Sequence, residues 1–263
     1  MTSARATGIK VKRVAPNAAD TPAASRRQAD LPTGGPETDW LLGLLQAGDS
    51  FYPTGSYAHS FGLEGLVQQG VVRDRATLRE FVLQSALPAL RHTDLPLAAY
   101  VWRALETPDW ERVGEISVLA SALKTARESR AAAENIGRQR AELMAALHGH
   151  PLAQEYLTRA AAAAWPVSPA VSAALEGRVL GAPLPAVLAG ITYAALAALL
   201  SAAMKLLRLG QNASQALLTE ALSRAPALIA AAATPLDEIG WFNPWLDIAA
   251  ARHESADSRM FIS

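Results

Sequence analysis

The chain has 263 residues, of which 51% are hydrophobic and 6% aromatic, and its 24 basic and 24 acidic residues give a formal net charge of zero. This balance argues against nucleic acid as the main partner, because phosphate binding needs a surplus of lysine and arginine on some face. The absence of cysteine excludes disulfides, thiolate nucleophiles and cysteine-based metal sites. It fits a reducing compartment, and we expect a cytoplasmic protein.

No segment shows the alternation of β-branched and polar residues that marks strands, so we predict an all-α fold with a single globular multi-helix domain. Residues 1–38 are polar, alanine-rich and proline-bearing, which predicts a disordered N-terminal arm without an export signal. The helical domain is expected over residues 39–263, with a flexible C-terminal tail at about 255–263.

A first helix is predicted after Asp39, and the segment that follows it, residues 51–64, is the most distinctive of the chain. It reads Phe-Tyr-Pro-Thr-Gly-Ser-Tyr-Ala-His-Ser-Phe-Gly-Leu-Glu. Ser56 is expected to cap a short helix, and Gly62 inside that helix to permit the close approach of another backbone or helix. A helix start with a hydrogen-bonded histidine explains these residues one by one, whereas their combination favours a recognition surface.

The remaining helices are predicted from their start signals, a capping side chain followed by proline or by an apolar stripe. These signals stand at Asp74, Thr93, Thr107, His150, Ser168 and Asn212. Between the last two, residues 182–204 carry no charge and have membrane-spanning length. Because alanine adds little insertion energy, we predict a central helix at 185–209, buried on all sides, rather than a membrane span.

Signatures of enzymes are missing: the chain has no P-loop, dinucleotide fingerprint, His-Glu-x-x-His or nucleophile elbow. His148 and His150 lack carboxylate companions and indicate a polar helix end. His59 and Glu64, five residues apart, do not share a helical face and form a poor acid–base pair. The alternative class, a helical-bundle metal- or haem-dependent oxidase, needs Glu-x-x-His sets that the chain lacks. We therefore expect a non-enzymatic, partner-binding protein without metal or cofactor.

The C-terminus is the second unusual segment, because three large apolar residues, Met260, Phe261 and Ile262, stand at its end. Such residues are a liability if they stay free in solvent. Either they pack into the core of the protein itself or they dock on a partner, and the sequence supports both alternatives equally.

These segments together resemble the UreF family of urease accessory proteins, over residues 40–263. The resemblance is carried by Leu-Leu-Gly-Leu-Leu-Gln (41–46), Pro-Thr-Gly-Ser-Tyr-Ala-His-Ser-Phe-Gly-Leu-Glu (53–64), Thr-Ala-Arg-Glu-Ser-Arg (125–130), Leu-Gly-Gln (209–211), Arg-His-Glu (252–254) and Ser-Arg-Met-Phe-Ile-Ser (258–263). The chain departs from the usual family pattern at Arg208, where proline is common, and around Trp165.

The resemblance implies a non-enzymatic, homodimeric scaffold that joins the accessory protein UreD, also called UreH, to the GTPase UreG. The assembly helps to place nickel and a carbamylated lysine in apo-urease, and the C-terminal tail meets the UreD-type partner. Neither nucleic acid nor a membrane is an expected partner. The partner-binding residues expected in the matched segments are Tyr57, His59, Ser60, Gly62, Glu64, Arg127, Glu128, Gly210, Gln211, Arg252, His253, Glu254, Arg259, Met260 and Phe261.

Overall fold

The structure, a computed structural model, describes residues 36–253, 256 and 258–262. The chain divides into two units, residues 1–33 and 34–263, and all described residues belong to the second. No strand occurs in the described part of the chain, which confirms the all-α prediction. The predicted N-terminal arm lies outside the described residues up to position 35, and the first helix begins at Pro36 rather than after Asp39.

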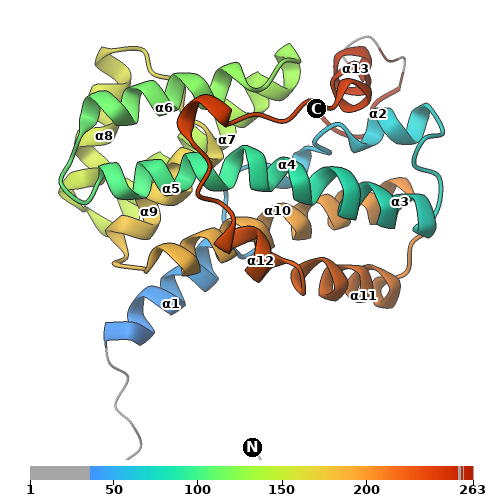
Figure 1. Cartoon of the computed structure of the whole chain (residues 1–263), viewed down its shortest axis with the longest axis horizontal. Coiled ribbons are helices and arrows are strands. Elements are labelled where there is room, and N and C mark those ends of the chain that lie inside the picture. Colours follow the sequence, from blue (N-terminus) through green and yellow to red (C-terminus); the bar gives the residue numbers. More distant parts are fainter. Residues whose placement is uncertain (1–35, 254–255, 257, 263) are drawn as a thin grey trace, which may run out of the picture. The chain divides into compact units, whose positions relative to one another are not determined.

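The helices follow one another with short connections (Figure 1). They are α1 (Pro36–Ala47), η1 (Ser56–Ala58), α2 (Leu63–Gln68), α3 (Arg75–Phe81), the π-helical η2 (Val82–Ala86), α4 (Leu87–His92), α5 (Asp94–Ala104) and α6 (Trp110–Ala122). The second half of the chain adds α7 (Arg127–His148), α8 (Pro151–Ala162), α9 (Pro169–Val179), α10 (Leu184–Leu206), α11 (Gln211–Leu222), α12 (Ala225–Ala230), η3 (Leu236–Glu238) and α13 (Pro244–His253).

Three of the predicted helix caps are confirmed. The side chain of Asp74 accepts a hydrogen bond from Thr77 N at the start of α3, and the His150 ring accepts one from Leu152 N at the start of α8. Ser168 caps α9 in the same way. Each side chain satisfies a backbone donor that the first turn of a helix leaves without a partner.

The caps predicted at the other three start signals are wrong. Thr93 stands at the N-cap of α5, but its hydroxyl donates to Ala89 O instead of capping. Asp109, not Thr107, caps α6, because its carboxylate accepts from the first turn. Asn212 lies inside α11, which begins at Gln211 after Gly210.

Buried apolar side chains form two clusters. One gathers side chains of α5 to α9, with Leu97, Ile116, Met144 and Leu175 among the most buried. The other lies among α2, α3, α10 and α11 and includes Leu63, Leu78, Leu196 and Leu200. Helix α10 contributes to both clusters, so it links the two parts of the core.

The helix buried on all sides is α9, not α10. Every residue of α9 from 170 to 177 is buried, because α5, α7, α8 and α10 all pack against it. Helix α10 ends at Leu206 and leaves Tyr193 45% exposed, so the prediction of an all-round buried helix at 185–209 is wrong. Among the described residues, α10 alone has the length and apolarity of a membrane span, and 44% of that stretch is buried in the core.

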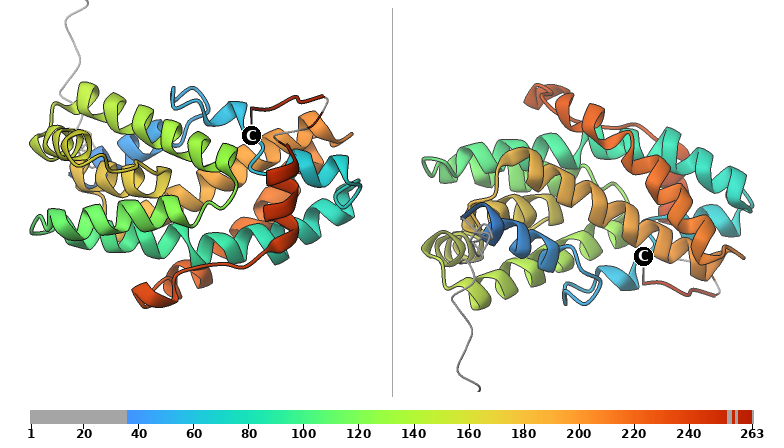
Figure 2. Two further views of the ribbon diagram at one scale, coloured as in Figure 1. Left: turned by 90° about the horizontal axis from the view of Figure 1, so that it is seen from above. Right: turned by 90° about the horizontal axis from the view of Figure 1, so that it is seen from below.

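The end of the chain returns to the beginning of the fold. Helix α13 packs against α2 and α7. The described tail residues 258–262 run back along α2, from a hydrogen bond with Gln68 to one with Ala58 (Figure 2). This arrangement brings the distinctive segment 51–64 and the C-terminal tail together.

Candidate protein-binding site around Glu64

The segment 51–64 does not fold as a single capped helix. Ser56 is the first residue of the short helix η1 and makes no side-chain cap, because Gly55 occupies the N-cap position. Gly55 has a left-handed backbone with φ of 77°. Gly62 stands at the N-cap of α2 rather than inside a helix, with φ of 84°. Two left-handed turns therefore redirect the chain, and glycine adopts this conformation without steric cost.

Glu64 is the centre of the site. Its side chain is buried, and its two carboxylate oxygens accept hydrogen bonds from the backbone nitrogens of Met260 at 2.7 Å and Phe261 at 3.0 Å. The Glu64 carboxylate also lies 2.9 Å from Nε2 of His253. A buried carboxylate needs such donors to offset the loss of its hydration. Glu64 thus joins α2, α13 and the tail.

A second carboxylate completes the cluster. Oε2 of Glu128, in the first turn of α7, lies 3.3 Å from Nδ1 of His253, and its Oε1 accepts from Nη1 of Arg259 at 2.8 Å. His253 is buried between the two carboxylates. Donation to both at once requires a ring protonated on both nitrogens. We call Glu64, Glu128, His253 and Arg259 the Glu64 cluster.

Helix α13 approaches α2 closely enough to require glycine on α2. A Cβ atom placed on Gly62 would lie 2.8 Å from Cδ1 of Leu246, and one on Gly65 would lie 2.5 Å from the carbonyl oxygen of Ala249. The atom near Gly62 is the end of a flexible leucine side chain, whereas the atom near Gly65 belongs to the backbone of α13. The tight approach is therefore at Gly65, and the approaching helix belongs to the same chain. Close packing of α13 in turn places His253 beside Glu64.

The tail divides its apolar side chains between core and solvent. Phe261 is buried in the cluster of α2, α3, α10 and α11, with Nζ of Lys205 5.1 Å from its ring centroid. The backbone nitrogen of Ile262 donates to Ala58 O at 2.9 Å, which ties the tail to η1. Met260 and Ile262 remain 61% and 64% exposed. Phe261 thus realises the first alternative, packing into the core, whereas docking on a partner stays a prediction. The flexibility predicted for the tail as a whole also stays a prediction, and hydrogen bonds hold residues 258 and 260–262 in this structure.

The structure brings together most of the predicted residues. His59 is buried at 8% exposure, which lowers the pKa of its ring, and Ser60 Oγ accepts from Glu64 N at 3.3 Å. Arg127 precedes Glu128 at the start of α7, and Arg252 precedes His253. By contrast, Gly210 and Gln211 stand at the exposed start of α11 and take no part in the hydrogen bonds of the Glu64 cluster.

The partner-binding role of all these residues stays a prediction, and for two of them the structure gives no side-chain position. The backbone of Tyr57 lies in η1 but its side chain is outside the description, and Glu254 lies outside the described residues. Gln68, whose Nε2 donates to Ser258 O at 3.0 Å, was missed, as was Lys205. No local pattern indicates either residue, because each contributes through a contact with a distant part of the chain.

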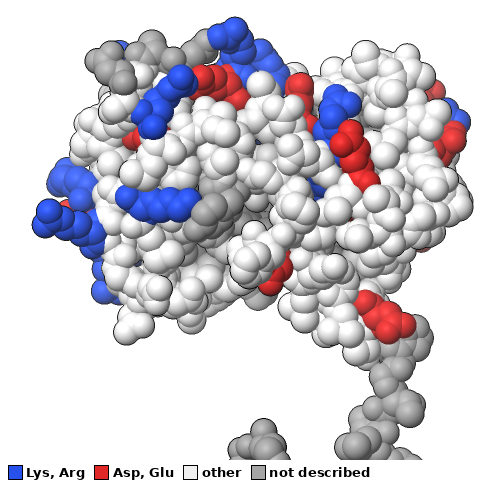
Figure 3. Space-filling model, turned by 180° about the vertical axis from the view of Figure 1, so that it is seen from behind, with Lys and Arg blue, Asp and Glu red and all other residues white. Residues whose placement is uncertain are grey.

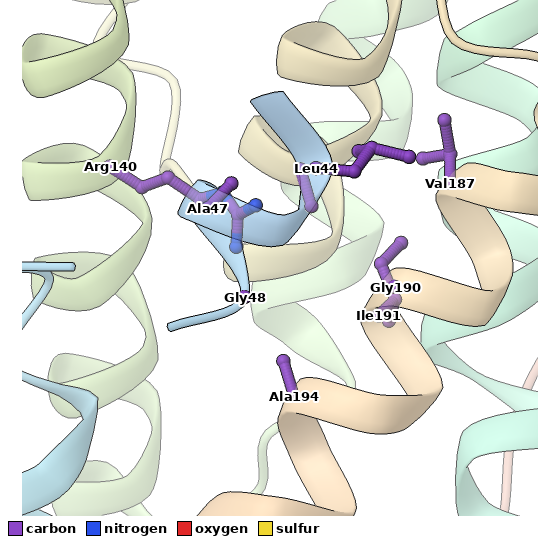
Figure 4. A pocket seen from close by; sticks show the side chains of 9 residues that line it. Leu44, Ala47, Gly48, Arg140, Val187, Gly190, Ile191 and Ala194 are labelled. Carbon is purple, nitrogen blue, oxygen red and sulfur yellow. The ribbon is translucent and has the colours of Figure 1, made fainter. Parts of the chain in front are cut away.

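The site offers surface rather than a substrate cavity. Two hollows are described, and neither is lined by a residue of the Glu64 cluster. One, between α1, α7, α9 and α10, has a volume of about 10 Å³ (Figure 4), room for roughly one water molecule. The other is an open hollow of about 650 Å³ between α6 and Trp165. The described part of the chain holds no group of three or more histidine or acidic side chains arranged to bind a metal ion. The carboxylates of the Glu64 cluster are engaged in fixing the tail.

Fold and site define an all-helical protein in which two unusual segments, far apart in sequence, are fastened together at the surface. Comparison with known proteins specifies the class. The UreF family model matches residues 72–222, and the chain belongs to the UreF family of urease accessory proteins.

Its relatives match along nearly their whole length. The urease accessory protein UreF of Cereibacter sphaeroides is 35% identical over 222 residues, which cover 84% of this chain and 97% of the relative. The UreF proteins of Paenarthrobacter aurescens and of an Arthrobacter species are 31% and 29% identical, each over 85% of this chain. The predicted family is confirmed, and these alignments extend beyond the part that the family model matches.

Proposed function

We propose that this chain is a non-enzymatic scaffold of urease maturation, which joins a UreD-type (UreH) partner to the GTPase UreG on apo-urease in the cytoplasm and so serves nickel insertion. Membership of the UreF family and the description of its relatives as urease accessory proteins support a role with urease. The residues of the Glu64 cluster support a role in binding other proteins, because they fix a surface.

The observation that carries the proposal is the exposure of Met260 and Ile262 on a tail that the Glu64 cluster holds in place. Phe61, 42% exposed, lies on the segment that leads into α2. Large apolar side chains that are exposed and held in one conformation favour protein–protein contact, since little ordering cost remains to be met on binding. We assign this surface to the UreD-type partner.

A second group of exposed apolar side chains, three of them aromatic, stands before and within α13. Trp241, Phe242, Trp245 and Ile248 are between 40% and 84% exposed. Tryptophan and other aromatic residues are enriched at the energetic centres of protein interfaces. Helix α13 and the residues before it thus combine two features of a partner-binding element, a side packed on α2 and exposed aromatic side chains.

A second apolar face supports homodimer formation. Helix α1 packs on α10, and Leu41, Leu42 and Leu45 of α1 are 45% to 62% exposed, as is Tyr193 of α10 at 45%. The side of the molecule behind the view of Figure 1 shows a wide area without charged side chains (Figure 3). We assign this face to a second copy of the chain.

Co-purification tests the bridging role. A tagged UreD-type partner from a urease operon would be expressed with UreG, in the presence and absence of this chain. We expect UreG to be retained only when the chain is present. Retention of UreG without the chain, or failure of the chain itself to bind the UreD-type partner, would contradict the proposal.

A further inference from the structure

A buried ionic group lies beneath the start of the distinctive segment, and no sequence pattern predicted it. Glu176 of α9 is 1% exposed. Its carboxylate accepts a hydrogen bond from Tyr52 Oη and is paired with Arg140 of α7, whose Nε lies 2.7 Å and Nη2 2.6 Å from Oε2. Three parts of the chain that are distant in sequence therefore meet at one carboxylate.

Tyr52 is held as a hydrogen-bond donor in this group. Burial, together with the negative charge of Glu176, raises the pKa of the Tyr52 hydroxyl further above neutral pH than its ordinary value already lies, so the hydroxyl is the donor of this hydrogen bond. The guanidinium carbon of Arg140 lies 5.8 Å from the centroid of the Tyr52 ring. Ring and hydroxyl are thus both fixed against α7 and α9.

The loop around Tyr52 is fixed on both sides. The backbone nitrogen of Phe51 donates to the Asp49 carboxylate at 2.7 Å, and Thr54 N donates to Tyr52 O at 2.7 Å. Gly55 lies against α7, since a Cβ there would be 3.0 Å from Oε1 of Gln139. Between these anchors the side chain of Phe51 is 91% exposed.

A contribution to stability alone does not explain why Glu176 and Arg140 form a buried ion pair. Replacement of a buried ion pair by well-packed apolar residues is often neutral or stabilising, because desolvation of the two charges offsets their attraction. A buried carboxylate that accepts from a loop residue does something that an apolar residue does not: it fixes the position of the loop.

We propose that Glu176 is a positioning residue of the partner-binding surface, which acts through Tyr52 to hold loop 49–55 on α7 and α9 and to present Phe51 to the UreD-type partner. The inference rests on the proposed function and deepens it. It adds to that surface one contact residue, Phe51, and the group that positions it, Tyr52, Glu176 and Arg140.

Three variants and one control separate positioning from stability. Tyr52→Phe removes the hydroxyl but leaves Glu176 paired with Arg140, so no charge is left alone. Phe51→Ser removes the exposed ring only. Glu176→Gln keeps an acceptor for Tyr52 but turns an amide donor toward Arg140. Ile116→Val, in the core cluster of α5 to α9, lowers stability without touching the loop.

Two measurements are made on each purified full-length variant: hydrogen exchange of the backbone amides of residues 51, 52 and 54, and affinity for the UreD-type partner. We expect Tyr52→Phe to speed exchange at these amides at least tenfold and to weaken binding about fivefold or more. Phe51→Ser should weaken binding to a similar degree with exchange little changed. Glu176→Gln should act like Tyr52→Phe with a lower Tm, and Ile116→Val should lower Tm alone.

Unchanged exchange in Tyr52→Phe would overturn the positioning role. Faster exchange with unchanged affinity in Tyr52→Phe, or normal binding by Phe51→Ser, would contradict the claim that Phe51 contacts the partner. An equal loss of binding in Ile116→Val would show that lower stability alone accounts for weaker binding, and would overturn the proposal. If Glu176→Gln does not fold, Tyr52→Phe decides. If the unaltered chain fails to bind the UreD-type partner, the proposed function is contradicted. The exchange measurements still test whether Glu176 positions the loop.

Discussion

The carboxylate of Glu64 accepts a hydrogen bond at 2.7 Å from the backbone nitrogen of Met260, a residue 196 positions later in the chain. One buried side chain on a short helix thereby anchors the C-terminus. The tail is held through its main chain at 260 and 261, and this leaves the side chain of Met260 free to face solvent.

Substitution of Glu64 by glutamine should loosen this anchor. A glutamine offers one acceptor oxygen and a donor group where Met260, Phe261 and His253 all present donors to the carboxylate. Hydrogen bonds to charged groups contribute about 1.5–3 kcal/mol each, and we expect Glu64→Gln to lower the free energy of unfolding by about 2 kcal/mol in urea titrations. Glu80→Gln, at an exposed position of α3, serves as the control; equal stability of the two variants would contradict the anchor.

Replacement by alanine should lower the stability of the protein at Phe261 but hardly at Ile262. Phe261 is buried in the core, and its replacement by alanine removes packing worth about 3 kcal/mol. Ile262 is 64% exposed, and Ile262→Ala should stay within about 0.5 kcal/mol of the unaltered chain. Thermal denaturation of both variants measures this contrast. A Phe261→Ala protein with unchanged Tm would show that the tail does not occupy its place in solution.

The packing of α13 on α2 depends on a small residue at Gly65. Alanine is the better helix former by about 1 kcal/mol, yet its Cβ would meet the carbonyl oxygen of Ala249 at 2.5 Å. We expect Gly65→Ala to destabilise the protein by about 1–3 kcal/mol. In Gly190→Ala, on α10, the new Cβ meets nothing within 4 Å, and this variant should be neutral or more stable. A stabilised Gly65→Ala protein would refute the close contact.

The lowered pKa values of His59 and His92 predict that the protein loses stability in acid. Burial lowers the pKa of His59, and burial together with the neighbouring Arg91 lowers that of His92. As pH falls below the unfolded value of about 6.5, the unfolded chain takes up protons before the folded one, so stability is lost. Tm should fall between pH 6.5 and 5.5, and His59→Gln should reduce the fall. An undiminished fall in His59→Gln would assign the effect to other groups.

Local chemistry explains which parts of this fold the sequence predicts. Caps at Asp74, His150 and Ser168 are readable because each depends on residues within one turn. The burial of α9 was not predicted, since α9 contains Ser172 and Glu176 whereas α10 is the more apolar helix; burial is set by the helices that surround an element, not by its composition alone.

The sequence predicted the two segments of the site but not the contact between them. The segment 51–64 and the tail each stood out from an alanine-rich background, yet nothing local indicates that Glu64 accepts from the amides of residues 260 and 261. The same holds for Tyr52 and Glu176, 124 positions apart. Hydrogen bonds over such separations leave no periodic trace in a sequence.

The affinity of the UreD-type partner for a Met260→Ser, Ile262→Ser double variant tests the central claim most directly. Both side chains are exposed, so the variant should keep the Tm of the unaltered chain. Burial of each side chain on binding contributes roughly 1.5–3 kcal/mol, and a tenfold change in affinity corresponds to about 1.4 kcal/mol. We predict binding at least tenfold weaker by calorimetry at unchanged Tm, whereas equal affinity would contradict the assignment of this surface.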